Sequence, residues 1–264
     1  SDRARKAAAE TVLRSIKENG VTLLSIGNGT ASYETEQFAA ALIQDNHLKD
    51  VHYLITNEAG ASVYSASKLA SEEFPEYDVN LRSAVSIARR LQDPLAELVK
   101  IDPMAIGVGQ YQHDMPQAKL EETLTGVVED CVNAVGVDIN TASPSLLERV
   151  SGLTKTTAKN IVAYREENGA FTARKQINKV PKLGPKAFQQ CAGFLRLPES
   201  AQVLDNTAVH PESYEAAEKL LALCGYTLAG VAAGGIAELP AGFEACGAQK
   251  AVVVRPSIRA WSSR

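Results

Sequence analysis

Two stretches of the chain place lysines at the start of a helical pattern, directly after a short turn. The first, LTKTTAKNIVAYREENGAF, runs from Leu153 to Phe171, and the second, KVPKLGPKAFQQCAGFL, runs from Lys179 to Leu195. The N-terminus of a helix presents free backbone N–H groups and a partial positive charge, so it can bind phosphate. Lysines at the same place add long-range attraction for a polyanion. The two stretches therefore predict contacts with phosphate groups.

The two stretches are copies of one pattern. VSGLTKTTA (150–158) and VPKLGPKAF (180–188) share an apolar residue, a turn, a second apolar residue and a helix start that carries lysine. The segments before them, TASPSLLERV and TARKQINKV, share Thr-Ala, a short helix and a final Val. A period of about 30 residues indicates an internal duplication. Two copies would hold two backbones, or two points of one backbone.

The turns and helix starts supply the candidate nucleic-acid-binding residues. They are Gly152, Thr154, Lys155, Lys159, Lys182, Gly184 and Lys186. No reader of base edges is evident, so binding to a DNA or RNA backbone should be independent of sequence and weakened by salt. The alternative is that the duplicated module serves only for packing.

The charge distribution points to the same region. Residues 141–197 hold ten Lys or Arg and three Glu, an excess of seven positive charges within a chain of net charge −4. The remaining residues hold 17 basic and 28 acidic side chains, an excess of eleven negative charges. A basic block in an acidic chain is typical of a polyanion-binding face, although a solvated surface that carries lysine by chance is the alternative.

Composition excludes several other classes. The 264 residues are 45% hydrophobic and 22% charged, as in ordinary globular proteins. No apolar run approaches the roughly 20 residues of a membrane span, and SDRARKAAAE lacks the apolar core of a signal peptide, so we expect a cytoplasmic location and no membrane partner. The four cysteines and four histidines are scattered. We therefore expect reduced thiols, no metal and no cofactor.

The first hundred residues alternate helix and strand. The expected helices cover 7–19, 33–44, 62–73 and 81–101, and the expected strands are VTLLSI (21–26) and VHYLIT (51–56). This alternation indicates βα units with a parallel sheet. Two strands are too few for an independent α/β domain, so we expect that the chain begins inside a domain whose earlier strands precede Ser1.

The rest of the chain is predicted to be all-helical, so the fold class is α/β followed by all-α. The expected helices cover 117–136, 143–150, 155–168, 173–178, 185–195 and 212–225. The predicted domains are a partial α/β domain (1–100), a helical connector (101–136), the duplicated domain (137–198), the start of a further helical region (199–230) and an atypical tail (231–264). The tail, from about Gly230, has no clear period, and is expected to be a poorly ordered, dispensable segment or a stretch translated in the wrong frame.

The duplicated stretches resemble the tandem helix-hairpin-helix module, through DINTASPSLLERVSGL, AKNIVAYREENGAF and VPKLGPKA. The usual hairpin has two glycines that flank one apolar residue. Here each copy keeps one, Gly152 beside Thr154 and Gly184 beside Lys182. Because Thr and Lys tolerate a positive φ less readily than Gly, it stays open whether both hairpins contact phosphate. We also expect Gly184→Val to be more harmful than the loss of a lysine, because it would bend the backbone.

The wider sequence resembles the Tex family of bacterial transcription accessory proteins. The resemblance rests on LLSIGNGTAS, NEAGASVYSAS, LRSAVSIARRLQDPLAELVKIDP and IGVGQYQHD, and it covers about residues 7–230. It implies a larger protein with an N-terminal helical part, a YqgF-like domain of ribonuclease H fold, tandem helix-hairpin-helix motifs, more helices and an S1 domain. It also implies nucleic-acid binding in transcription, with RNA polymerase or ribosome-associated machinery as candidate partners.

The ribonuclease H fold raises the question of a nuclease. Such nucleases hold two Mg²⁺ with several carboxylates, and the resemblance implies that Glu58 and Asp93 stand at two of these positions. The first-strand Asp would lie upstream of Ser1, so we expect no complete metal site. The competing interpretation makes Glu58 a helix N-terminal carboxylate and Asp93 an N-cap before Pro94. We expect a non-enzymatic binding protein; the alternative is a metal-dependent nuclease or resolvase, truncated here.

Overall fold

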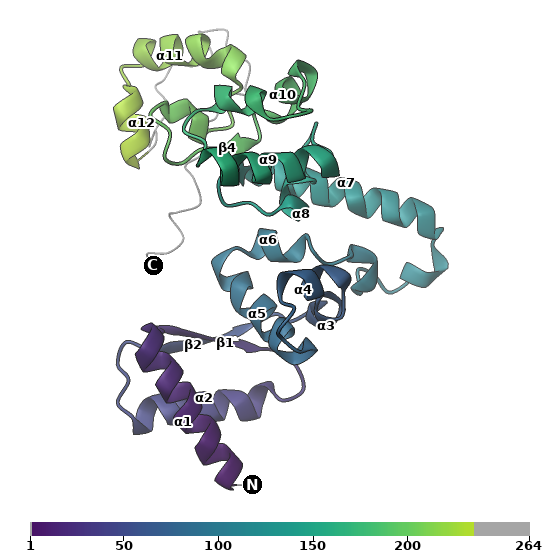
Figure 1. Cartoon of the computed structure of the whole chain (residues 1–264), viewed down its shortest axis with the longest axis vertical. Helices are drawn as coiled ribbons and strands as arrows, with labels where there is room; N and C mark the ends of the chain where they lie inside the picture. The colour runs from purple at the N-terminus through teal and green to yellow at the C-terminus, as the bar shows by residue number, and fades with distance from the viewer. Residues whose placement is uncertain (1, 235–264) are drawn as a thin grey trace. The chain divides into compact units, whose positions relative to one another are not determined.

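The computed structural model describes residues 2–234, and the chain divides after Leu120 into two compact units (Figure 1). The first unit mixes helices with a parallel pair of strands, and the second is helical apart from two very short strands. The predicted fold class is therefore confirmed. In the described residues, no helix has both the length and the apolar character to cross a membrane.

The first unit opens with a βαβ arrangement. Its elements are α1 (Asp2–Asn19), β1 (Leu23–Gly27), α2 (Ser32–Asp45) and β2 (His52–Thr56). The strands run parallel, with Leu23 opposite His52 and Gly27 opposite Thr56. Ile16 of α1, Leu42 of α2 and Val51 form one buried cluster, so the two helices pack together beside the start of β2. The parallel pairing brings the loops after β1 and β2 to the same edge of the sheet.

Two predicted helices of this unit are each broken in two. The expected helix 62–73 is α3 (Ala61–Ser65) and α4 (Lys68–Glu73), because the Ser67 hydroxyl caps a new helix by accepting from the Ala70 amide. The expected helix 81–101 is α5 (Val79–Gln92) and α6 (Pro94–Leu98). Proline cannot continue a helix, and Asp93 caps α6 by accepting from the Ala96 amide at 3.0 Å. The helical periodicity continued across both breaks and hid them.

A buried ionic cluster ties these short helices together. The Lys100 ammonium lies 3.0 Å from the Glu73 carboxylate and 2.9 Å from that of Glu97, and Tyr64 donates to Glu73. Burial, with the Glu73 hydrogen bond as the second cause, raises the pKa of Tyr64. Two short 3₁₀ helices, η1 (Pro103–Ala105) and η2 (Gln112–Asp114), follow. The cluster links α3, α4 and α6 beside an apolar cluster of Tyr64, Ala70 and Ile101.

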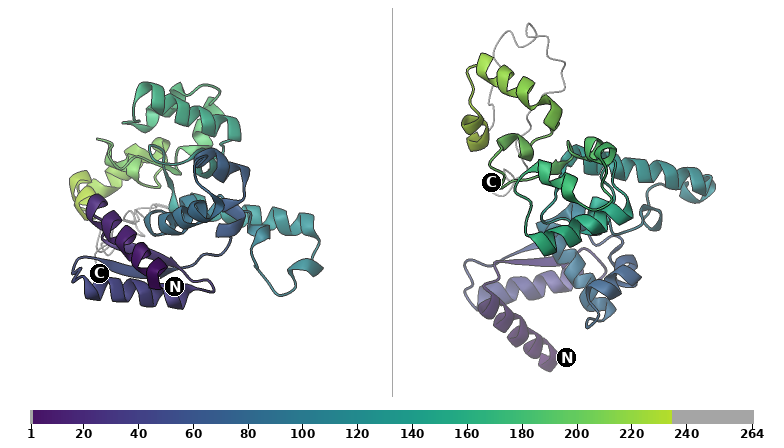
Figure 2. Two further views of the ribbon diagram at one scale, coloured as in Figure 1. Left: turned by 60° about the horizontal axis from the view of Figure 1, so that its bottom comes forward. Right: turned by 45° about the horizontal axis from the view of Figure 1, so that its top comes forward.

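The second unit contains the duplicated region (Figures 1 and 2). Its elements are α7 (Gln117–Val135, which begins at the end of the first unit), β3 (Val137–Asp138), α8 (Pro144–Leu147), α9 (Lys155–Asn168), η3 (Arg174–Lys179), α10 (Pro185–Cys191) and β4 (Leu195–Arg196). Strands β3 and β4 pair in parallel and so join the start of the duplicated region to its end. Then come η4 (Val203–Asn206), η5 (Pro211–Ser213), α11 (Tyr214–Leu223) and α12 (Leu228–Gly234).

The core of this unit is organised around a buried arginine. Arg174 is 1% exposed, and its guanidinium donates to the carbonyl oxygens of Leu195, Thr207 and Val209. It also donates to the Tyr214 hydroxyl at 2.8 Å, and its backbone N–H donates to Asp205 at 2.9 Å. Burial is the main cause that lowers the pKa of this guanidinium. Arg174 was counted with the basic block, but it joins η3 to β4, η4 and α11 instead.

The expected tail begins inside a helix. Residues 230–234 belong to α12, so the expectation that order ends near Gly230 is wrong for them. The remainder of that tail, residues 235–264, lies outside the described residues. The cysteines of the described part, Cys131, Cys191 and Cys224, are free.

Replacing Arg174 by Met should lower the free energy of unfolding by about 3–5 kcal/mol, because three carbonyl oxygens and the Tyr214 hydroxyl would lose their buried donor. The matched control is Lys175→Met, at an exposed neighbouring position, which should change the same free energy by less than about 0.5 kcal/mol. Urea unfolding followed by far-UV circular dichroism measures both. Similar values for the two variants would contradict a central role for Arg174.

Candidate nucleic-acid interface

The two duplicated turns have the same backbone conformation. In hairpin 1 (residues 150–154) Gly152 has a φ of +81°, and in hairpin 2 (residues 180–184) Lys182 has a φ of +62°. The residue two positions later is extended in both and caps the following helix, with φ of −116° at Thr154 and −77° at Gly184. Each turn is closed by the same hydrogen bond, 3.0 Å long from Leu153 N–H to Val150 and 3.2 Å long from Leu183 N–H to Val180.

The two glycine slots of a hairpin therefore have different requirements. Only the first slot needs a positive φ, so Thr154 in the second slot is unstrained. Thr154 in fact forms a capping box, since its hydroxyl accepts from Thr157 N–H at 3.3 Å while the Thr157 hydroxyl accepts from Thr154 N–H at 2.7 Å. The strained residue is Lys182, for which the left-handed conformation costs about 1 kcal/mol.

Gly152 is constrained by its neighbours, and Gly184 is not. A Cβ at Gly152 would lie 2.5 Å from the Cβ of Gln190 and 3.1 Å from the Ala187 carbonyl oxygen, both on α10. A Cβ at Gly184 would have no atom within 4 Å, and the φ there suits any residue. The expectation that Gly184→Val would bend the backbone is therefore wrong, and hairpin 1 holds the indispensable glycine.

The four candidate lysines project into solvent. Lys155, Lys159, Lys182 and Lys186 are all exposed, and none of them forms an ion pair with another residue of the described chain. Lys155 and Lys159 are one turn apart on α9, so they lie on the same side of that helix. Their charges are therefore available to an external anion.

Three cations of the basic block face inward. Arg174 is buried, Arg165 donates to the Ile139 carbonyl oxygen at 2.7 Å, and Arg196 donates to that of Gly193 at 2.5 Å. Burial, with nearby Arg174 as a smaller cause, lowers the pKa of Arg196 to about 10. The other seven of the ten carry the basic surface: Arg149, Lys155, Lys159, Lys175, Lys179, Lys182 and Lys186.

Two asparagines that the sequence analysis did not single out contact the hairpins. The side-chain oxygen of Asn133, on α7, accepts from Ser151 N–H at 3.0 Å. The side-chain amide of Asn160, on α9, donates to the Pro181 carbonyl oxygen at 2.7 Å. Asn133 and Asn160 precede their hairpin partners by 18 and 21 residues. Asparagine has a low helix propensity, so its presence within two predicted helices indicated a role other than helix formation.

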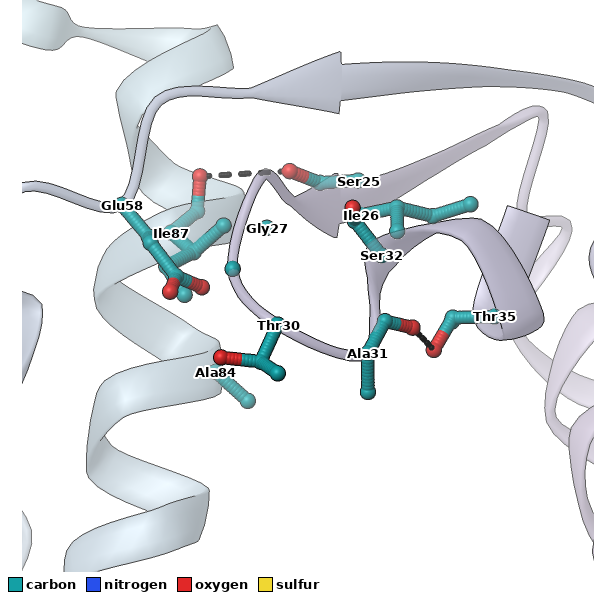
Figure 3. Close-up of a pocket in the computed structure, with 11 residues that line it drawn as sticks. Ser25, Ile26, Gly27, Thr30, Ala31, Ser32, Thr35, Glu58, Ala84 and Ile87 are labelled. Carbon is teal, nitrogen blue, oxygen red and sulfur yellow. Dashed lines mark hydrogen bonds between the residues drawn. The ribbon is translucent and has the colours of Figure 1, made fainter.

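The first unit has a separate pocket of about 390 Å³ after β1 and β2 (Figure 3). The Glu58 carboxylate faces the loop after β1, and it occupies the space that a Cβ on Gly27 or Gly29 would need. The Asn28 side-chain oxygen accepts from Glu58 N–H at 3.0 Å and so joins the two loops. The glycines thus make room for Glu58.

This pocket does not bring together Glu58 and Asp93, the two candidate metal-binding carboxylates. Asp93 is not among the residues that line it, and α5 contributes Ala84 and Ile87 there. Asp93 instead caps α6, as the competing interpretation predicted. Glu58 precedes α3 by three residues, but its carboxylate faces the loop before α2. Within residues 2–234 no group of three or more His, Cys, Asp or Glu side chains is placed to hold a metal ion.

Comparison with known protein families agrees with this arrangement. Residues 1–92 match the Tex protein YqgF-like domain, residues 132–196 match the helix-hairpin-helix motif, and residues 202–238 match an HHH domain. The chain therefore joins a YqgF-like domain to helix-hairpin-helix domains.

By sequence the chain belongs to the Tex family. It is 61% identical over 219 residues to the transcriptional accessory protein Tex of Neisseria gonorrhoeae and 57% identical over 220 residues to the protein tex of Bordetella pertussis. It is 47% identical over 253 residues to the human S1 RNA-binding domain-containing protein 1. These matches cover 83%, 83% and 77% of the chain, but only 29%, 28% and 25% of the relatives.

The two hairpin glycines should respond differently to alanine. Gly152→Ala should lower the free energy of unfolding by about 1–3 kcal/mol, because it adds backbone strain and an overlap with α10. Gly184→Ala should change it by less than about 0.5 kcal/mol. Urea unfolding of the two variants measures the difference, and equal losses would contradict the assigned roles of the two slots.

Proposed function

We propose that this chain binds the sugar–phosphate backbone of DNA or RNA through hairpins 1 and 2, without reading base sequence and without cleaving the strand. The observation that carries the proposal is the pair of identical turns, flanked by four exposed lysines that have no ion-pair partner in the described chain. Binding would release counterions from the nucleic acid, which favours association at low salt.

The two hairpins would use different donors. Helix α9 has 14 residues, so its first turn offers free N–H groups and a partial positive charge beside Lys155. Helix α10 has 7 residues, so hairpin 2 would depend more on Lys182 and Lys186. The left-handed conformation of Lys182 is unfavourable, and a contact between its ammonium group and a phosphate would offset that strain.

A role in transcription is proposed from the relatives. The Neisseria gonorrhoeae relative is named a transcriptional accessory protein, and the human relative is named an S1 RNA-binding domain-containing protein. The chain spans about 29% of the length of the gonococcal relative, so the likeness supports a share in such a role. RNA polymerase or ribosome-associated machinery, in the cytoplasm, would be the setting.

Binding without cleavage is supported by the positions of the two candidate carboxylates, Glu58 and Asp93. Two-metal nucleases need several carboxylates that converge on one site. Asp93 accepts from Ala96 N–H and caps α6. Glu58 is the one carboxylate among the residues that line the pocket after β1 and β2. The side chains that face this pocket from α5 are apolar.

Loss of the four hairpin lysines should weaken binding strongly. The quadruple variant of Lys155, Lys159, Lys182 and Lys186 to Ala should reduce the slope of log affinity against log salt by about 4, roughly 1 for each lost phosphate contact, on every sequence tested. The measurement is fluorescence anisotropy with a short DNA duplex and a single-stranded RNA over a salt series.

The matched control removes the same charge from the other unit. Lys6, Lys17, Lys49 and Lys68 are exposed in the first unit, and their change to Ala should leave the salt slope unaltered. If both quadruple variants lose the same affinity, net charge alone drives binding. If the hairpin variant keeps the slope of the parent, the duplicated module serves only for packing.

The chain should not cleave nucleic acid in the presence of Mg²⁺. Branched DNA, duplex DNA and single-stranded RNA should stay intact on denaturing gels, and Glu58→Gln should behave like the parent. Metal-dependent cleavage that disappears in Glu58→Gln would establish the nuclease alternative.

A further inference from the structure

Each of the two hairpins is held by an asparagine side chain from a preceding helix. Ser151 and Pro181 are the second residues of hairpin 1 and hairpin 2. The side-chain oxygen of Asn133, on α7, accepts from Ser151 N–H, whereas the side-chain NH₂ of Asn160, on α9, donates to the Pro181 carbonyl oxygen. Each turn is therefore supported by an asparagine from a helix that precedes it, although the two asparagines are not equivalent positions of the duplication.

The supports are unequally reinforced. Hairpin 1 packs against α10, where Gln190 and the Ala187 carbonyl leave no room for a Cβ on Gly152. Lys182, the residue of hairpin 2 that corresponds to Gly152, is exposed, and so is Gly184, where an added Cβ would have no atom within 4 Å. Hairpin 2 thus depends more on its asparagine than hairpin 1 does.

The backbone of hairpin 2 is also more strained than that of hairpin 1, because its positive-φ residue is a lysine and not a glycine. Lys182 is in the left-handed region, which a lysine leaves readily when nothing holds the turn. The buried side chains of Val180 and Leu183 anchor the two ends of the turn, and Asn160 holds the carbonyl of the residue that precedes Lys182. Loss of that hydrogen bond would free Lys182 without removing the apolar anchors.

We propose that Asn160 is a positioning residue for the phosphate contact of hairpin 2, and that Asn133 has the equivalent, weaker role for hairpin 1. This inference rests on the proposed function. Asn160 contacts the hairpin from within α9, whose first turn follows hairpin 1. One helix therefore fixes both turns, and the nucleic acid meets them at a set separation.

The test is a double-mutant cycle on binding at low salt, with the short duplex and the single-stranded RNA as probes. Asn160→Ala should weaken binding about fivefold, the equivalent of about 1 kcal/mol for one hydrogen bond. Lys182→Ala should then cost little in the Asn160→Ala background, because an unfixed lysine has little contact left to lose. Lys155→Ala should cost the same factor in both backgrounds.

Three further variants separate positioning from stability. Asn168→Ala removes a similar side-chain hydrogen bond, to the Tyr164 carbonyl oxygen of the same helix, and should leave binding unchanged. Asn133→Ala should leave the Lys182 effect intact. Asn160→Gln keeps an amide donor and should restore part of the affinity. Urea unfolding shows that each variant is folded, and Asn160→Ser replaces Asn160→Ala in the cycle if the latter does not fold.

Two results would overturn the inference alone. One is wild-type affinity for Asn160→Ala, and the other is an equal cost of Lys182→Ala in both backgrounds. A different pattern marks failure of the proposed function itself. In that case Lys182→Ala has no effect even in the parent, or the parent shows no salt-dependent binding, and the inference is overturned with it.

Discussion

The second unit depends on one buried charge. A guanidinium in a dry interior is costly unless its donors find acceptors, and each of the three guanidinium nitrogens of Arg174 donates, to the carbonyl oxygens of Leu195, Thr207 and Val209 and to the Tyr214 hydroxyl. These acceptors come from β4, from the loop after η4 and from α11, so the segments after the duplicated module are fixed to the helix that leads into hairpin 2. Hairpin 2 and the helical region that follows it therefore form one packed structure, so a substitution in either should alter the stability of both.

The sequence predicted what local rules decide. The bounds of α9 were predicted correctly because the residues at its two ends, Thr154 as cap and Gly169 as terminator, are strong signals, and the duplication located both hairpins. The inward turn of Arg174 could not be predicted, because a count of charges carries no information on burial. The breaks at Ser67 and Asp93 had visible capping signals, but the apolar period continued across them. Periodicity records which face is buried, and two short helices can share a face.

The position of the candidate site was predicted from the sequence, but the backbone requirements of its two hairpins were not. Comparison with the usual hairpin treated its two glycines as equivalent, whereas their φ values show that only the first slot demands glycine. Hairpin 1 therefore loses nothing with Thr154, which is a better cap than glycine, while hairpin 2 bears strain at Lys182. The supports from Asn133 and Asn160 link residues that are distant in the chain, so no local pattern reveals their partners.

Glycine-containing turns precede helices both in the loop after β1 and at hairpins 1 and 2, and their surroundings distinguish them. In the loop after β1, the Glu58 carboxylate occupies the space over Gly27 and Gly29, so a phosphate there would meet a negative charge at close range. At hairpins 1 and 2, exposed lysines stand at the same place relative to the turn, and their charges are not neutralised by an ion pair in the described chain. Glycine allows a close backbone approach in both places, but the sign of the neighbouring charge decides what can approach. That difference favours the hairpins over the YqgF-like domain as the phosphate-binding surface of this chain.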